Sequence, residues 1–234
     1  MLNFKGKKSI VLGGTSGIGL ATAKALLEAG AEVIVGSRNG NESDDTKKMT
    51  VVKIDVLDRE ELSLLFERHA PFDFLVNAAT GGFRARGPFM EMDMDGFQGS
   101  FAKLWGYTNS VRLGASHLKE DGAIVLISGA PARKCRPGNS AISTVGNAVE
   151  GFVRAVAPEI APRRINVVSP GLIDTPMFAN QGDDRETFFE NATAKNLIPR
   201  AGKPEEVASA VMFVLGNSFV TGTTVDVDGG ALLS

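Results

Sequence analysis

The amino-acid sequence predicts an α/β fold, a doubly wound parallel sheet of about seven strands with helices on both faces. Short apolar runs alternate with helical segments along the chain, and this alternation favours parallel pairing of the strands. The chain has 234 residues with 43% hydrophobic content, which is enough to bury one complete α/β core. We therefore expect a single domain over residues 1–234.

The strands of this sheet are expected where the apolar runs lie. In chain order these runs are Lys8–Leu12, Glu32–Ser37, Thr50–Val56, Phe72–Asn77, Ala123–Ile127, Arg164–Val168 and Thr223–Val227. In a doubly wound sheet, ligands bind outside the carboxyl ends of the strands. Candidate binding residues are therefore expected where these segments end.

Helices are expected between the strands, beginning with the one that directly follows the first strand. Near its start, the last helix has a proline, and two glutamates follow in its first turn, where they suit the positive end of the helix dipole. The later helices are expected over Phe97–Leu118, Ala141–Ile160 and Pro204–Leu215.

The first strand runs into a glycine-rich turn, GGTSGIG, and straight out into a helix. Gly13 allows the sharp turn, Gly17 lets the backbone approach a ligand, and Gly19 lets the helix pack on the strand. The free N–H groups of the first helical turn then face an anion. A tight turn needs glycines too, but the strand before it and the helix after it favour a nucleotide site. The residues expected to bind the cofactor here are Gly13, Thr15, Ser16, Gly17, Ile18 and Gly19.

The second strand ends at Ser37 and Arg38, where a site for NAD would usually place Asp or Glu. A hydroxyl and a guanidinium suit a 2′-phosphate, and Glu32 lies at the other end of the strand. A charge-assisted bond from arginine to phosphate contributes about 1.5 to 3 kcal/mol, so NADP(H) should be preferred over NAD(H) by about one to two orders of magnitude. The alternative is that Arg38 is simply solvated on a loop.

Five segments together resemble the short-chain dehydrogenase/reductase family. They are GGTSGIG after the first strand, Asp55 in IDV, VNAAT at 76–80, VVSPGLIDTP at 167–176 and VDGG near the end. The resemblance covers nearly the whole chain and implies a Rossmann-like enzyme that binds NAD(P). It places Asp55 and Val56 near the adenine, Asn77, Ala78 and Ala79 along the ribose, and Thr175 near the nicotinamide carboxamide. Ala78 and Thr80 depart from the family's NNAG pattern.

The sequence departs from this family most clearly at the active site. In the family a Tyr, with a Lys four residues later, begins the helix after the fifth strand. Matching NAVEGFVRA to the family pattern places Ile142 at the position of the Tyr and Gly146 at the position of the Lys. Neither side chain can donate a proton. The single tyrosine of the chain, Tyr107, lies in the preceding helix.

Ser128 and Lys103 are the remaining candidates for the family's catalytic positions. A Ser just after the fifth strand helps to hold the substrate carbonyl in the family; LISGA offers Ser128, although counting back from Ile142 falls on Gly129. Lys103, in KLWG, stands where the family has a helix Asn. We hypothesise that its ammonium reaches the space that Gly146 leaves open and supplies a proton. The alternatives are Ser128, a bound water, or a Lys103 that only pairs with an acidic neighbour or extends to solvent.

The substrate is a small molecule whose class the sequence leaves open. The resemblance implies that Phe178–Leu197 covers the substrate, and its aromatic residues, Phe178, Phe188 and Phe189, permit an apolar acyl or ring substrate. Cations on two loops at the same sheet edge would suit an anionic substrate, or they are charged only because these loops are wet. The cations are Arg84, Arg86, Arg133, Lys134 and Arg136.

Other partners are expected to be few. The net charge of −2 and the lack of a long basic stripe exclude nucleic acid and anionic membranes as main partners, and no apolar run approaches membrane-spanning length. The lone Cys135 and a Met1–Lys8 segment unlike a signal peptide predict a cytoplasmic protein. His69 and His117 form no metal-binding spacing, so no metal is predicted. The resemblance also implies a homo-oligomer, a dimer or tetramer.

The leading functional hypothesis is an NADP(H)-dependent oxidoreductase with a non-standard catalytic site. It would transfer a hydride between the nicotinamide and a carbonyl or alcohol substrate. One alternative is a catalytically inactive NADP(H)-binding sensor or partner subunit, which would bind the cofactor without turnover. A purely structural homo-oligomeric scaffold is the third, and it would not bind NADPH at all.

Overall fold

A seven-stranded sheet, in which every neighbouring pair of strands is parallel, forms the centre of the computed structural model. The structure describes residues 3–40, 43–80 and 84–234, with only the backbone described at 180–183. The strand order is β3-β2-β1-β4-β5-β6-β7. Because β1 (Lys8–Leu12) lies between β2 (Glu32–Ser37) and β4 (Phe72–Asn77), the order reverses beside β1. This arrangement confirms the predicted doubly wound α/β fold.

The other four strands differ in length from their predicted bounds. These strands are β3 (Thr50–Lys53), β5 (Leu118–Ile127), β6 (Arg164–Pro170) and β7 (Thr224–Val227). β3 ends before the predicted Val56 because its partner β2 ends, with Ser37 opposite Lys53. β6 runs further than predicted because β7 still pairs with it, with Pro170 opposite Val227.

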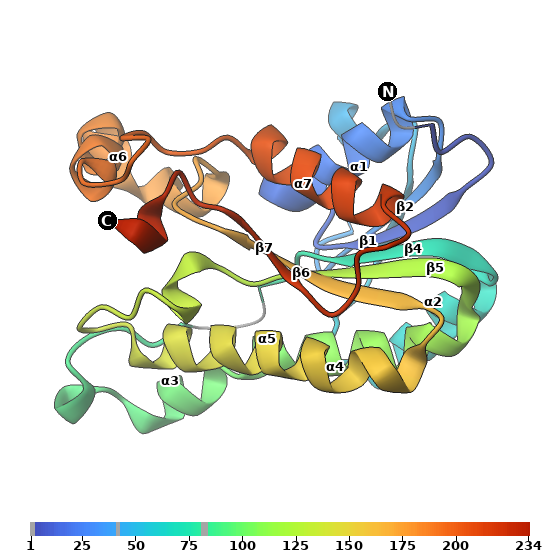
Figure 1. Ribbon diagram of the computed structural model, residues 1–234, viewed down its shortest axis with the longest axis horizontal. Helices are drawn as coiled ribbons and strands as arrows, with labels where there is room; N and C mark the ends of the chain where they lie inside the picture. The colour runs from blue at the N-terminus through green and yellow to red at the C-terminus, as the bar shows by residue number, and fades with distance from the viewer. Residues whose placement is uncertain (1–2, 41–42, 81–83) are drawn as a thin grey trace.

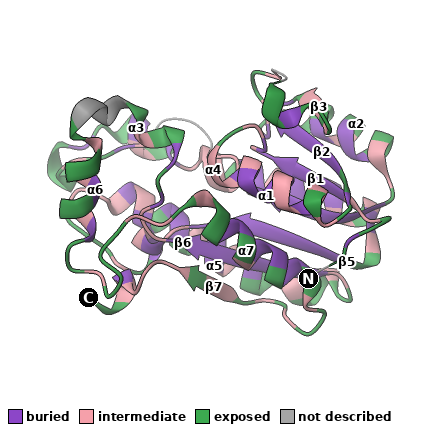
Figure 2. Cartoon of the chain, turned by 90° about the horizontal axis from the view of Figure 1, so that it is seen from above, coloured by how far each residue is buried: buried purple, intermediate pink, exposed green. Residues whose placement is uncertain are grey.

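Helices cover both faces of the sheet (Figure 1). On one face α1 (Gly17–Glu28) packs against α7 (Pro204–Gly216), and on the other α4 contacts both α2 and α5. Each helical layer shares an apolar core with the sheet, so the strands are buried on both sides (Figure 2). The remaining helices are α2 (Arg59–His69), α3 (Met94–Gly99), α4 (Ala102–Gly114), α5 (Ser140–Ile160) and α6 (Arg185–Thr193).

The predicted helix Phe97–Leu118 is wrong in its extent. The chain forms α3, a turn, and then α4, which is followed by a short 3₁₀ segment at Ala115–His117. At the turn the Ser100 hydroxyl donates to the Gly96 carbonyl at 2.9 Å and accepts from the Ala85 N–H at 2.9 Å. A serine that bonds the carbonyl four residues earlier competes with the regular helix. The separate α4 begins beside the carboxyl ends of the central strands.

A segment after β6 extends beyond the carboxyl ends of the strands. It consists of a 3₁₀ stretch, η5 (Pro176–Asp184), followed by α6. In Figure 1, α6 and the C-terminus lie at the same end of the molecule. It overlaps most of Phe178–Leu197, the segment expected to cover the substrate.

Candidate functional site

A cavity of about 890 Å³ lies at the carboxyl ends of the strands. It runs from the glycine-rich turn after β1, past the ends of β2 and β4, to the loop after β5 and the start of η5. Every residue that the sequence predicts for the cofactor or for catalysis lines it, with the exception of Asn77. These lining residues are Gly13, Thr15, Ser16, Gly17, Ile18, Gly19, Ser37, Arg38, Asp55, Val56, Ala78, Ala79, Lys103, Ser128 and Thr175.

The glycine-rich turn has a backbone that only glycine fits. Gly13 and Gly17 have φ angles of 75° and 51°, in the left-handed region. A Cβ on Gly13 would lie 2.7 Å from the Ala79 nitrogen, and one on Gly19 would lie 2.1 Å from the Gly13 carbonyl oxygen. Ser16 caps α1 by position, but its side chain makes no capping hydrogen bond, so it leaves the first-turn N–H groups to a ligand. The turn therefore suits a bound phosphate.

The end of β2 brings a hydroxyl and a cation to the cavity. Ser37 is half-buried, and its hydroxyl accepts from the Gly40 N–H at 3.2 Å, which holds the following loop. Arg38 is exposed at the rim and has no carboxylate partner within the described residues. Asp55 lines the cavity just after β3, and its carboxylate accepts from the Leu57 N–H at 3.0 Å. These groups can hold the adenosine end of a dinucleotide.

Asn77 acts from behind the cavity wall. It is fully buried at the end of β4, where its amide nitrogen donates to the Ser110 hydroxyl at 2.8 Å. Its amide oxygen accepts from the Ala79 N–H at 3.0 Å. The side chain thus fixes the backbone of Ala78 and Ala79, which do line the cavity.

The cavity residues fit a nicotinamide dinucleotide. Open N–H groups at the start of α1 suit its phosphates, and no side chain could replace the glycines beneath them. Thr175 closes the same wall further along, with its methyl 3.4 Å from where a Gly17 Cβ would lie. Arg38 and Lys103 line the same cavity as this turn.

The other end of the cavity joins the two candidate catalytic residues. The Lys103 ammonium donates to the Ser128 carbonyl at 3.3 Å and lies 5.5 Å from the centre of the Tyr107 ring. The Ser128 hydroxyl donates to the Gly146 carbonyl at 3.3 Å. Tyr107 is buried and donates its hydroxyl to the Ile127 carbonyl at 2.8 Å. Burial also raises the pKa of Tyr107, so this phenol stays protonated.

Lys103 differs from an ordinary surface lysine in its titration. Burial, and secondarily the charge of Arg84, lower its pKa to about 7. Both effects disfavour the charged ammonium. A lysine of this pKa can give or take a proton near neutral pH.

The expectation that Gly146 leaves an open space is wrong. A Cβ at this position would lie 2.8 Å from the Ala132 Cβ, because the short segment after β5 folds back onto α5. Ala132 therefore occupies the volume that a side chain at 146 would need. Lys103 does not enter it and instead contacts the Ser128 carbonyl. Ile142 lines the cavity as an apolar wall residue.

Two of the three loop cations after β5 serve the structure. Arg133 forms ion pairs with Asp226 and the buried Glu150. Lys134 donates to backbone carbonyls of the C-terminal residues Ala231 and Ser234. These contacts tie the loop to β7, α5 and the chain end. Besides Lys134, the cations of the two loops that line the cavity without a carboxylate partner in the described structure are Arg84, Arg86 and Arg136.

An aromatic cluster and an arginine hold the segment after β6. The rings of Phe178, Phe188 and Phe189 lie 5.5–5.7 Å apart between centres, and the first two line the cavity. Arg185 lies over Phe189 and donates to the Thr175 carbonyl at 2.9 Å. Arg185 was not among the predicted site residues, because no sequence motif links it to Thr175, ten residues earlier.

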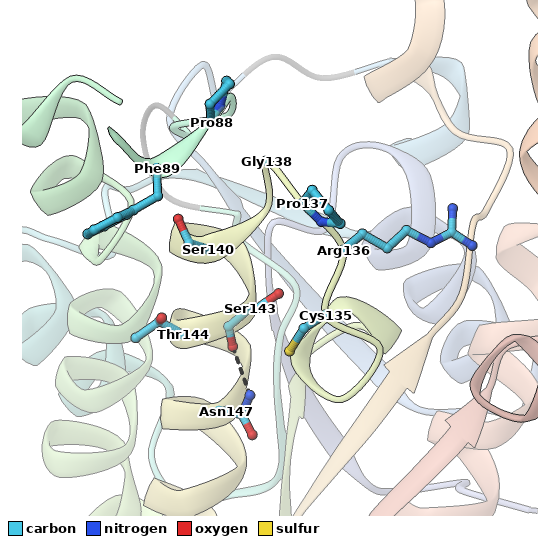
Figure 3. Close-up of a pocket in the computed structure, with 10 residues that line it drawn as sticks. All are labelled: Pro88, Phe89, Cys135, Arg136, Pro137, Gly138, Ser140, Ser143, Thr144 and Asn147. Atoms are coloured by element: carbon cyan, nitrogen blue, oxygen red, sulfur yellow. Dashed lines mark hydrogen bonds between the residues drawn. The ribbon is translucent and has the colours of Figure 1, made fainter. Parts of the chain in front are cut away.

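A second hollow, of about 700 Å³, lies beside the large cavity (Figure 3). Its walls come from the segment at Pro88, the loop at Cys135 and the first turns of α5. Arg136 lines both hollows, and Figure 3 shows its side chain extending away from Ser143. Cys135 is exposed at the lip. No acid–base pair is among the residues of this hollow, so it is not the candidate active site.

Among the described residues, no group of three or more His, Cys, Asp or Glu residues lies where it could hold a metal ion. None of the described helices combines the length and the apolar character needed to cross a bilayer.

Comparisons with known proteins agree with the fold and the cavity. A family model described as Enoyl-(Acyl carrier protein) reductase matches residues 13–231. The chain is 31% identical to the short-chain dehydrogenase/reductase ATR9 of Stachybotrys chlorohalonatus, with all of both chains covered. It is 32% identical to carbonyl reductase family member 4 of Danio rerio, with 96% of this chain and 98% of that protein covered.

Solved structures give the same result. A small-chain dehydrogenase crystallised in complex with NADPH superposes with a TM-score of 0.87 at 32% identity, over 97% of this chain and 99% of that one. The ligand-free aldohexose dehydrogenase of Thermoplasma acidophilum superposes with a TM-score of 0.88 at 30% identity, over 99% of this chain and 96% of that one. Both likenesses extend over nearly the whole of each chain.

Proposed function

Because this chain belongs to the short-chain dehydrogenase/reductase family, we propose that it is an NADP(H)-dependent oxidoreductase that interconverts a carbonyl compound and an alcohol. Its main support is the continuity of one cavity from the glycine-rich turn to Lys103 and Ser128. When bound there, the reduced cofactor supplies a hydride from C4 of its nicotinamide. A related small-chain dehydrogenase was crystallised in complex with NADPH.

The proposed cofactor site uses residues at or after the ends of five strands, β1, β2, β3, β4 and β6. The first turn of α1 binds the pyrophosphate through backbone N–H groups. Ser37 and Arg38 bind the 2′-phosphate, which gives the preference for NADP(H). The remaining contacts, near the adenine, the ribose and the nicotinamide carboxamide, come from Asp55, Val56, Ala78, Ala79 and Thr175.

Lys103 is the proposed proton donor to the carbonyl oxygen. It holds a proton at about the right affinity, since its pKa is about 7, and it lies beside Ser128 at the end of the cavity. Ser128 is the proposed hydrogen-bond donor to the substrate, after turning its hydroxyl from the Gly146 carbonyl. Ile142 has no proton to give.

Turnover and cofactor binding together test this function. NADPH oxidation is measured over a broad panel of aldehydes and ketones, and NADPH binding by fluorescence titration. Lys103→Ala should lower turnover by about 10²- to 10⁴-fold, the usual contribution of general acid catalysis, and leave NADPH binding intact. Lys48→Ala, an exposed lysine outside the cavity, is the matched control. Unchanged turnover in Lys103→Ala would remove Lys103 from the mechanism.

A second candidate function is a catalytically inactive NADP(H)-binding sensor or partner subunit. Ile142 and Gly146, which line the cavity without a proton to donate, favour it. NADPH binding with no turnover over the whole panel would support this alternative. A failure to bind NADPH would instead leave only a structural scaffold.

We also propose a homo-oligomer, a dimer or tetramer, in the cytoplasm. Trp105 on α4 is 61% exposed, and a large exposed aromatic side chain is typical of an interface. Light scattering on the intact protein and on Trp105→Ser measures the assembly. A monomer in both proteins would refute the oligomer.

A further inference from the structure

The substrate end of the cavity carries positive charge that no carboxylate of the described residues balances. Among the described residues that line the cavity, the one acidic side chain is Asp55, at the adenine end. Lys134 is bound to the chain end. The other cations at the substrate end make no ion pair within the described structure; they are Arg84, Arg86, Lys103 and Arg136.

Arg84 and Lys103 are the most closely coupled of these cations. Both are half-buried, and the charge of Arg84 opposes the charge of Lys103. The pKa of Arg84 is also lowered, mainly by burial. Two like charges held together in a partly desolvated site repel each other, and an anion between them removes this repulsion. The pair is therefore suited to an anionic ligand group.

Arg84 also contacts the segment that follows β6. Its Nη1 donates to the Met177 sulfur at 3.5 Å, which lies on η5. A thioether is a weak acceptor, so this contact leaves the guanidinium free to exchange it for a stronger one. Phe178 and Phe188, on the same segment, provide an apolar wall next to it.

We propose that Arg84 binds the carboxylate of an oxo acid whose carbonyl group lies at Lys103 and Ser128. This inference rests on the proposed reductase function and names its substrate class. Arg84 and Lys103 line the same cavity, so the carboxylate and the carbonyl can belong to one small substrate. The apolar remainder of the oxo acid packs against Phe178 and Phe188.

The cofactor's own phosphates do not account for this pair of cations. In the proposed site they bind at the start of α1 and at Arg38, whereas Arg84 follows β4 and Lys103 lies on α4. A planar guanidinium also matches the two oxygens of a carboxylate with parallel N–H donors. The substrate is thus the anion that would neutralise Arg84.

Binding of the acid should be linked to the protonation of Lys103. The titratable and charged groups that act on Lys103 are Arg84, from the loop after β4, and Tyr107, from α4 itself. A carboxylate beside the ammonium favours its charged form and raises its pKa. Above pH 7 the complex therefore takes up a proton, whereas at pH 6 Lys103 is already largely protonated. The same bound carboxylate keeps Lys103 protonated, so that it can donate its proton during reduction.

Calorimetry can measure this binding without turnover. The protein is saturated with NADP⁺ and titrated with 4-methyl-2-oxopentanoate or with its methyl ester; neither can be reduced, because cofactor and ligand are both oxidised. We expect the acid to bind at least about 10-fold tighter than the ester, the usual worth of a charge-assisted hydrogen bond. Two buffers of different ionisation enthalpy should reveal proton uptake at pH 8 but not at pH 6.

Two charge-matched variants locate the binding. Arg84→Gln should weaken the acid by about 10- to 100-fold, leave the ester unchanged and abolish the difference between them. Arg86→Gln, an exposed cation on the same loop, should change the affinity for the acid by less than about threefold, because solvent screens it. Equal affinities for acid and ester, equal losses in both variants, or no binding of the acid would overturn the proposal.

The proposed function fails separately. If NADPH does not bind, or binds without turnover, the reductase is refuted. The same titrations on the cofactor-free protein then still decide whether Arg84 selects the acid.

Discussion

Replacing Arg38 with Gln should weaken NADPH binding and leave NADH binding unchanged. Arg38 is exposed, lines the cavity at the end of β2 and has no carboxylate partner in the described part of the chain. Its removal therefore leaves no buried group unpaired. The Ser37 hydroxyl keeps its contact with the Gly40 N–H, so the local loop should be preserved. The change isolates the interaction between the guanidinium and the 2′-phosphate.

The size of the loss follows from the exposure of Arg38. A hydrogen bond to a charged group contributes about 1.5 to 3 kcal/mol, and solvent at the cavity rim places Arg38 near the lower limit. This corresponds to an increase of about 10- to 30-fold in the Kd for NADPH. Added salt should reduce the difference between wild type and variant, since the interaction is screened.

Fluorescence titration with NADPH and NADH gives both Kd values for each protein. Arg112→Gln, which removes the same charge from an exposed position on α4 outside the cavity, is the control. An Arg38→Gln protein that loses the same factor for both cofactors would show that Arg38 does not bind the 2′-phosphate. Unchanged NADPH binding would mean that Arg38 is merely solvated.

Three further predictions concern the turn, the proposed acid and a surface ion pair. Gly13→Ala should destabilise the protein in urea unfolding by at least about 1 to 2 kcal/mol, from its φ of 75° and a Cβ 2.7 Å from a backbone nitrogen. Gly6→Ala, with a φ of 78° but no atom within 4 Å of its Cβ, isolates the backbone cost, and equal losses in both would contradict the close contact. Carbonyl reduction, measured as kcat/KM, should fall as pH rises through about 7, where Lys103 loses its proton; a level profile to pH 9 would exclude it as the acid. Hydrogen bonds from Arg200 hold the pKa of Glu206 at about 2, so this carboxylate stabilises the fold above its unfolded pKa and less as pH falls towards 2. Glu206→Gln should therefore lower Tm slightly at pH 7 and not near pH 2, and an equal shift at both would refute this origin.

The parts of the site that depend on local backbone were predictable from the sequence. The spacing of Gly13, Gly17 and Gly19 specifies a turn whose φ angles and contacts leave no room for a side chain. Apolar runs of strand length set the parallel sheet, and the end of each strand marked a cavity residue, as at Ser37 and Arg38. Errors in strand length, as for β3, arose because a strand ends where its neighbour ends.

The catalytic end could not be predicted in the same way, because its contacts join residues far apart in the chain. The sequence suggested open space at Gly146, but Ala132 folds back into that volume. From the sequence, Arg133 and Arg84 were equivalent candidates for binding an anionic substrate. The fold pairs Arg133 with Asp226, whereas Arg84 lines the cavity and forms no ion pair with any described residue.

The sequence by itself determined the sheet, the glycine-rich turn and the cation at the end of β2, since each depends on neighbouring residues and their periodicity. Only the tertiary structure decided what surrounds Lys103. Its contact with Ser128 and its nearness to Arg84 come from three separate segments that meet at one sheet edge. Burial at that meeting point, rather than the identity of the residue, brings its pKa to about 7.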